Sequence, residues 1–248
     1  MDWLDFAVFA FVAAIASYVQ AVTGFAFGLI MVGICSIFGL APIELTAAFV
    51  SFSAFASALI SMRGTSGDIH RPIALAVMLG SLPATLLGFY GLGYLSDNYA
   101  ELLKRILGIT ILCAGVLLIF NPSRYLKVSR KPSFVLCGFV GGLMGGAFSV
   151  PGPPIVYHIY RQPIPVATIK ATLLLIFSAA YLLRVLMFFV DDAPHGDVLK
   201  ITLLSLPAVL IGTLIGKYLP PSLSDQAIRR CAFLLLSGMG LTMFWMTL

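Results

Sequence analysis

Long apolar segments alternate with short polar stretches along nearly the whole chain. A helix needs about 20 consecutive apolar residues to cross the hydrocarbon core of a bilayer. Two of the segments, 29–40 and 155–160, are too short to do so at a rise of about 1.5 Å per residue. The pattern predicts six ordinary spans, at 43–62, 73–95, 102–120, 165–190, 198–219 and 227–247.

Each of the two short segments follows an interrupted apolar segment. "TGFAFG" at 23–28 separates 3–22 from 29–40, and "SVPGPP" at 149–154 separates 134–148 from 155–160. Glycine and proline disfavour a continuous helix at both places. The sequence therefore predicts two broken units, 3–40 and 134–160, each a helix, an interruption and a short returning piece.

An internal repeat relates the two halves of the chain. "SLPATLLG" at 81–88 recurs as "SLPAVLIG" at 205–212, 124 residues later. Shorter matches at an offset of 121 pair Ala26-Phe27 with Ala147-Phe148, Pro42-Ile43 with Pro163-Ile164, and Arg63 with Arg184. We expect two repeats, 1–124 and 125–248, in one membrane domain, each with one broken unit and three spans.

Composition assigns the chain to the helical integral membrane proteins. It is 60% hydrophobic and 10% charged, whereas soluble domains carry about 25% charged residues. The net charge of +5 comes from short loops, which indicates topology rather than nucleic-acid binding. The four cysteines are far apart, so we expect neither a metal site nor a cofactor. Hydrolase and kinase motifs are absent, so we do not expect an enzyme.

The positive residues decide how the broken units lie in the membrane, because Lys and Arg collect on the cytoplasmic side. If each unit crosses the membrane, the two sides carry equal numbers. If each unit is a V that returns to its own side, the cytoplasmic side carries Arg63, Arg71, Arg124, Lys127, Arg130, Lys131, Arg161, Lys170, Lys217, Arg229 and Arg230. The outer side then keeps only Lys104, Arg105 and Lys200. The V arrangement fits, and it puts both termini outside.

A V plus three spans gives each half an odd number of crossings, so the two halves have opposite orientations. The predicted fold is thus an all-α integral membrane inverted repeat, with a V-shaped broken unit and three transmembrane helices in each half. Inverted repeats with interrupted helices are typical of secondary transporters. We expect the two breaks to meet near the midplane and to offer their backbone groups to a substrate.

The breaks supply most of the candidate substrate-binding residues. Free N–H groups and a partial positive charge at half-helix N-termini suit an anion. The candidates at the breaks are Gly24, Gly28, Gly145, Gly146 and Gly152, with Gln20, Thr23 and Ser149 as side-chain donors. Helix packing through small residues is the alternative for each of them, and we prefer it for Gly138 and Gly141.

Few charged residues lie inside the apolar segments. Lys170 could attract an anion from the cytoplasm, or its side chain could simply reach the interface. Arg184 and its repeat mate Arg63 are candidate gates, or else interface anchors. His158 could bind an anion or carry a proton, or be structural. Since no Asp or Glu lies deep in any segment, an anion is a better substrate than a cation.

The glycine-rich breaks "AVTGFAFGLIMVG" and "GGLMGGAFSVPGPPIVY", with the duplicated "SLPA" helix, resemble the TauE/SafE sulfite-exporter family. The resemblance covers essentially the whole chain. It implies a transporter of sulfite, sulfonates or related sulfur anions in a bacterial inner membrane, with the anion held at 24–28 and 145–154. The chain departs from the family's richer glycine run, with Phe25, Ala26 and Phe27 between Gly24 and Gly28.

The expected function is secondary transport of small sulfur-containing anions, most simply export, by alternating access around the two breaks. The coupling ion could be a proton carried with the substrate, and a homo-oligomer is possible. An anion channel and a non-transporting membrane subunit remain the alternatives.

Overall fold

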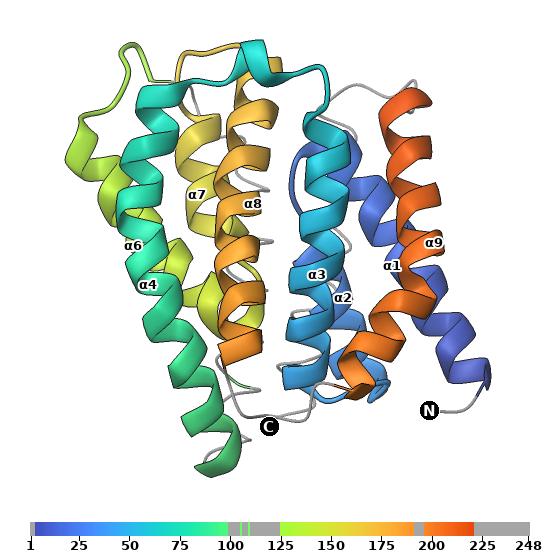
Figure 1. Cartoon of the computed structure of the whole chain (residues 1–248). Coiled ribbons are helices and arrows are strands. Elements are labelled where there is room, and N and C mark those ends of the chain that lie inside the picture. Colours follow the sequence, from blue (N-terminus) through green and yellow to red (C-terminus); the bar gives the residue numbers. More distant parts are fainter. Residues whose placement is uncertain (1–2, 99–104, 106–108, 110–124, 191–195, 221–248) are drawn as a thin grey trace.

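The computed structural model describes residues 3–98, 105, 109, 125–190 and 196–220, and within these ranges it is helical, with no strand. The helices are α1 (Trp3–Thr23), α2 (Phe27–Phe38), α3 (Ile43–Met62), the short 3₁₀ helix η1 (Ser66–Asp68), α4 (Arg71–Asn98), α6 (Lys131–Phe148), α7 (Gly152–Tyr160), α8 (Val166–Val190) and α9 (Gly196–Tyr218) (Figure 1).

Six of these helices are long and apolar enough to span a membrane: α1, α3, α4, α6, α8 and α9. The prediction of an all-α integral membrane protein is confirmed. The predicted span 43–62 coincides with α3, whereas 227–247, and 102–120 apart from residues 105 and 109, lie outside the described residues.

Both broken units form, with backbone conformations that interrupt the helix. Gly24 and Ala26 each have φ of 85° between α1 and α2, and Ser149 has φ of 55° between α6 and α7. These left-handed conformations end an α-helix and redirect the chain. Figure 1 shows α1 beginning and α2 ending at one end of the bundle, and α6 beginning and α7 ending at the opposite end.

The returning helices begin earlier than the sequence predicts. We expected them to start at residues 29 and 155, but α2 starts at Phe27 and α7 at Gly152. Pro153 and Pro154 lie in the first turn of α7, where an N–H would have no helical partner, so they start the helix instead of prolonging the break. The second interruption is thereby confined to Ser149, Val150 and Pro151.

Glycines let helices from the two predicted repeats approach closely. α4 packs along α6, where Gly138, Gly142 and Gly146 face the backbone of α4 near Val77, Ser81 and Thr85. α9 packs along α1, with Gly212 against Ala14 and Gly216 against Tyr18. A Cβ atom at these glycines would overlap backbone atoms, so the packing role expected for Gly138 fits the structure.

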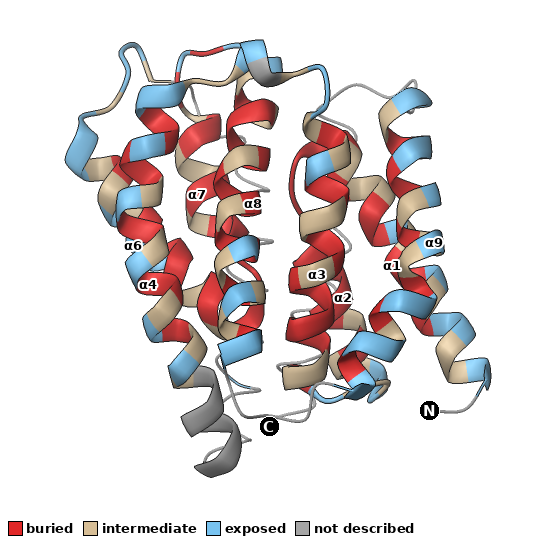
Figure 2. Ribbon diagram, in the orientation of Figure 1, coloured by how far each residue is buried: buried red, intermediate tan, exposed pale blue. Residues whose placement is uncertain are grey.

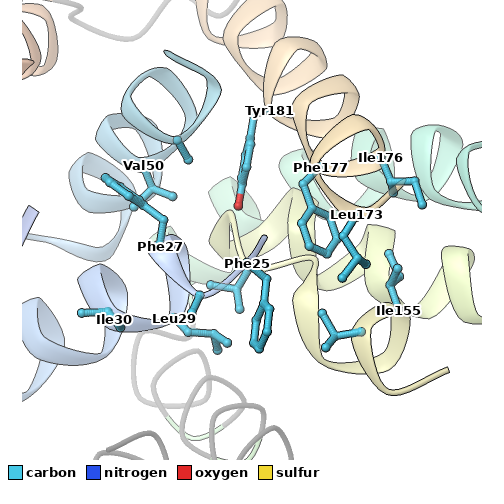
Figure 3. Packing of buried hydrophobic residues seen from close by; sticks show 14 of the residues in the cluster. Phe25, Phe27, Leu29, Ile30, Val50, Ile155, Leu173, Ile176, Phe177 and Tyr181 are labelled. Carbon is cyan, nitrogen blue, oxygen red and sulfur yellow. The ribbon is translucent and has the colours of Figure 1, made fainter. Parts of the chain in front are cut away.

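The buried residues form a continuous interior, while apolar side chains such as Leu75 and Leu203 are exposed on the outer faces (Figure 2). Exposed apolar faces suit contact with lipid, where no polar outer surface is needed. The interior core includes Phe49. Figure 3 shows part of it, where Phe27 of α2 lies near Val50 of α3 and Phe177 of α8.

Candidate functional site

The two breaks contact each other inside the bundle. Gly28, in the first turn of α2, packs so closely against the Ser149 carbonyl group that a Cβ atom would have no space. At the other end of the first break, the Tyr160 hydroxyl donates to the Thr23 carbonyl oxygen at 3.4 Å. The first break therefore runs alongside α7, from Tyr160 at its end to Ser149 just before its start.

Ser149 anchors the second break to α3. It is the C-cap of α6, and its backbone N–H donates to Gly145 O at 2.9 Å. Its hydroxyl donates to Ala47 O at 2.7 Å and lies 2.8 Å from the Ser51 hydroxyl. The Ser51 hydroxyl also lies 2.8 Å from Ala47 O, so the two serines share one carbonyl acceptor.

Arg184 of α8 completes this network. Its Nε donates to Ser51 Oγ at 3.0 Å, and its Nη1 donates to Gly145 O at 3.3 Å. Its guanidinium carbon also lies 5.3 Å from the centre of the Phe89 ring. One guanidinium group thus joins α8 to α3 and to the end of α6, directly at the second break.

Arg184 is a buried cation without a carboxylate partner in the described part of the chain. Only 3% of its surface is exposed, and its described partners are a hydroxyl, a carbonyl and an aromatic ring. Burying a charge without a counter-charge lowers the free energy of unfolding by roughly several kcal/mol, unless a bound ligand supplies the opposite charge. The geometry therefore favours an anion here, and the interface-anchor alternative for Arg184 does not fit its burial.

Tyr181 extends the donor set. It lies three residues before Arg184 on α8, so both side chains lie on the same face of the helix. It is buried, and Figure 3 shows its hydroxyl pointing between Phe27 and Phe177. A neutral hydroxyl within an apolar wall can donate to an oxyanion without adding charge.

Lys170 lies at the other break. A Cβ atom on Gly24 would lie 3.3 Å from the Lys170 carbonyl oxygen, so this turn of α8 packs directly on the first break. Lys170 and Arg184 are fourteen residues apart, or about 21 Å along the helix. α8 therefore carries one basic residue beside each break.

Two of the predicted donors of the first break already have protein partners. Thr23 Oγ1 donates to the carbonyl groups of Val19 and Phe25, at 2.7 and 2.9 Å. Gln20 Nε2 donates to Ala54 O at 3.1 Å, whereas Gln20 Oε1 is buried without a partner among the described residues. Gln20 thus leaves its amide oxygen in the interior as an acceptor without a described partner.

The remaining predicted residues lie apart from the Arg184 network. His158 is held to α6 by Ser133 Oγ at 2.9 Å and by the Phe134 ring at 4.9 Å. Arg63 is exposed at the C-cap of α3, because Gly64 with φ of 86° ends that helix. Gly146 faces α4, and Gly152 lies beside Leu29 with room for a methyl group.

Sequence reasoning missed Ser51 and Tyr181. A signal for each was present: Ser51 belongs to a run of serines within an apolar span, and Tyr181 is one turn before the only arginine of its segment. Neither signal indicates a partner, because Ser51 and Arg184 are 133 positions apart in the chain.

These features define a class of molecule: a helical membrane protein with a buried cationic donor set where two broken helices meet. The chain matches the family described as "Sulfite exporter TauE/SafE" over residues 9–243, and it belongs to that family. The resemblance found in the glycine-rich breaks is thus confirmed.

A curated relative agrees with this assignment. The chain is 35% identical over 224 residues to a protein of Cupriavidus necator named "Probable sulfite/organosulfonate exporter TauE". The match covers 90% of this chain and 88% of the relative. No solved structure matches the chain.

Proposed function

We propose that this protein is a secondary transporter that exports small sulfur-containing anions, such as sulfite or organosulfonates, across a bacterial inner membrane. The observation that carries the proposal is the buried Arg184 at the second break, which has no carboxylate partner in the described ranges. The family and the name of the Cupriavidus relative support a sulfur oxyanion as the ligand.

The proposed anion site consists of Arg184, Ser51, Ser149 and Tyr181. Arg184 supplies charge-assisted N–H donors, which are the strongest partners for an oxyanion. The hydroxyl protons of Ser51 and Ser149 now point to Ala47 O or to each other. Rotation about one bond redirects either proton to an anion, so the site can gain donors without moving the backbone.

The proposed mechanism is alternating access between two inverted halves. Its support is that α4 packs along α6 and α9 along α1, so the third long helix of each half packs on the broken unit of the other. The broken units also return to opposite ends of the bundle (Figure 1). Rocking of one half against the other would expose the breaks to each side in turn.

Lys170 has a separate place in this mechanism. It lies near the start of α8, beside the first break and about 21 Å from Arg184. By the positive-inside rule this end faces the cytoplasm. An anion would first meet the field of Lys170 and then move along α8 to Arg184.

The test is sulfite efflux from proteoliposomes that contain the purified protein, with taurine-type sulfonates, thiosulfate and sulfate as competitors. We expect saturable efflux, inhibited by at least one sulfur anion, that falls at least tenfold in Arg184→Gln. Arg63→Gln is the matched control, since Arg63 is exposed at a helix end, and it should retain efflux.

Three results would contradict the proposal. Efflux by Arg184→Gln equal to that of the wild type would remove Arg184 from the site. Non-saturating anion conductance in a planar bilayer would identify a channel. No flux of any sulfur anion, from folded and inserted protein, would overturn the substrate assignment.

A further inference from the structure

A second buried polar cluster lies away from Arg184, where α1, α3 and α9 meet. Its members are Ser17 and Gln20 on α1, Ser53 and Ser57 on α3, and Thr213 on α9, all at most 2% exposed. We call these five residues the three-helix cluster.

Contacts join four of these residues, and Ser53 lies one turn before Ser57 on the same face of α3. Thr213 Oγ1 donates to Ser57 Oγ at 2.9 Å, which joins α9 to α3. Gln20 Nε2 donates to Ala54 O, one turn before Ser57, which joins α1 to α3. Gly212, next to Thr213, packs against Ser17, one turn before Gln20.

Two oxygen atoms of the cluster have no partner among the described residues. The Gln20 amide nitrogen must face the Ala54 carbonyl group, so Oε1 is the free end of that side chain, and it is buried without a partner among the described residues. The Ser53 hydroxyl also has no partner there. Ser51, by contrast, bonds the carbonyl group one turn back, as a serine inside a helix can do.

A buried oxygen atom without a hydrogen-bond partner destabilises a membrane protein. A buried polar group without a hydrogen-bond partner lowers stability, and such groups in native proteins normally bond protein, water or an ion. An amide oxygen and hydroxyl oxygens are acceptors that suit a hard cation. Lys217 bonds the carbonyl groups of Ile60 and Arg63 at the end of α3, which leaves the level of Ser53 and Gln20 for the ligand.

We propose that the three-helix cluster binds a sodium ion through Gln20 Oε1, the hydroxyl oxygens of Ser53 and Ser57, and neighbouring backbone carbonyl groups. Binding by neutral oxygens requires no proton release. No Asp or Glu is buried in the described part of the chain, so that part supplies no carboxylate for a proton relay.

The site would make sodium the coupling ion, an extension that rests on the proposed transport function. α1 and α3 belong to the first predicted repeat, and α9 belongs to the second. A cation at their junction stabilises the contact between the halves, and its release loosens that contact. Sodium binding itself can be measured without any transported anion.

The experiment is thermal unfolding of the full-length protein in detergent, titrated with NaCl, KCl or choline chloride at constant chloride and without sulfur anions. We expect a saturable rise in Tm with NaCl alone, of roughly 5 to 10 °C at about 100 times Kd. Gln20→Leu and Ser53→Ala should lose this rise.

Ser81→Ala is the matched control. Ser81 is also a fully buried serine whose hydroxyl has no described partner, but it lies on α4 against α6. The Tm rise with sodium should persist in this variant. It should also persist in Arg184→Gln, which separates sodium binding from the anion site.

Two results would overturn the proposal. Equal Tm shifts with sodium, potassium and choline would show a general salt effect, and water would then satisfy the cluster. An undiminished sodium shift in both Gln20→Leu and Ser53→Ala would place the ion elsewhere. If Gln20→Leu does not fold, the sodium-dependent Tm shift of Ser53→Ala is the test, because that substitution removes only one oxygen atom and should leave the fold intact.

Discussion

Replacing Arg184 by methionine should abolish transport and leave the stability of the protein nearly unchanged. Methionine is about as long as the arginine stem and fills the same apolar space without charge or donors. Replacing an arginine that serves only the fold should lower the free energy of unfolding. Replacing an arginine that serves ligand binding should not, because such a residue is retained for function at some cost in stability.

The magnitude follows from the contacts of Arg184. The Arg184→Met variant lacks the two charge-assisted hydrogen bonds to Ser51 and Gly145, each of about 1.5–3 kcal/mol. Removing a buried charge recovers a desolvation penalty of several kcal/mol, roughly the same amount. Neither partner is left unsatisfied, since Ser51 still bonds Ala47 O and Gly145 O still accepts the Ser149 N–H.

The net change in the free energy of unfolding should therefore lie within about 2 kcal/mol of zero. That corresponds to a Tm within about 8 °C of the wild type for a chain of this size. The assays are thermal unfolding in detergent and sulfite efflux from proteoliposomes, with Arg63→Met as the exposed control. A Tm lower by more than about 10 °C, or normal efflux, would refute the reasoning.

Two further predictions concern packing and topology. Gly28→Ala should lower the free energy of unfolding by about 1–3 kcal/mol, because the new Cβ atom would overlap the Ser149 carbonyl group. Gly152→Ala is the control: its nearest neighbours would be 3.9 Å away, so its Tm should be unchanged or higher. Equal Tm values for the two variants would show that the breaks do not pack this closely. The topology is tested with single cysteines in a cysteine-free background. Asp197→Cys should react with an impermeant thiol reagent added outside the cell and Lys127→Cys should not, because the two exposed positions lie at opposite ends of the bundle. The reverse labelling pattern would show the opposite orientation in the membrane.

Much of the fold could be predicted because hydrophobicity and helix interruption are local properties. The span 43–62 coincides with α3, and both broken units form where glycine and proline interrupt apolar segments. α7 begins three residues before the start that the sequence predicts, because proline breaks a helix in its interior but not at its start. Its effect depends on position, and in the first turn it favours the helix.

The candidate site was less predictable because it depends on contacts between distant segments. Ser149 and Arg184 were found as a break residue and an intramembrane charge, but their link through Ser51 spans 98 and 133 positions. Arg63 and Arg184 are equivalent in the repeat, yet only Arg184 is buried. The reason is local: α3 ends at Met62, so Arg63 lies at its C-cap just before Gly64, whereas α8 continues past Arg184 to Val190.

The same hydrogen bonds that satisfy Arg184 offer a way to couple anion binding to movement. Nε and Nη1 hold α8 to α3 and to the second break, and an anion would compete for these donors. Exchanging two such bonds involves about 3–6 kcal/mol. Moving a two-state equilibrium from 1:99 to 99:1 needs about 5.5 kcal/mol of differential binding. At the upper end of that range the two energies are comparable, so we expect anion binding at Arg184 to weaken the contacts of α8 with α3 and with the second break.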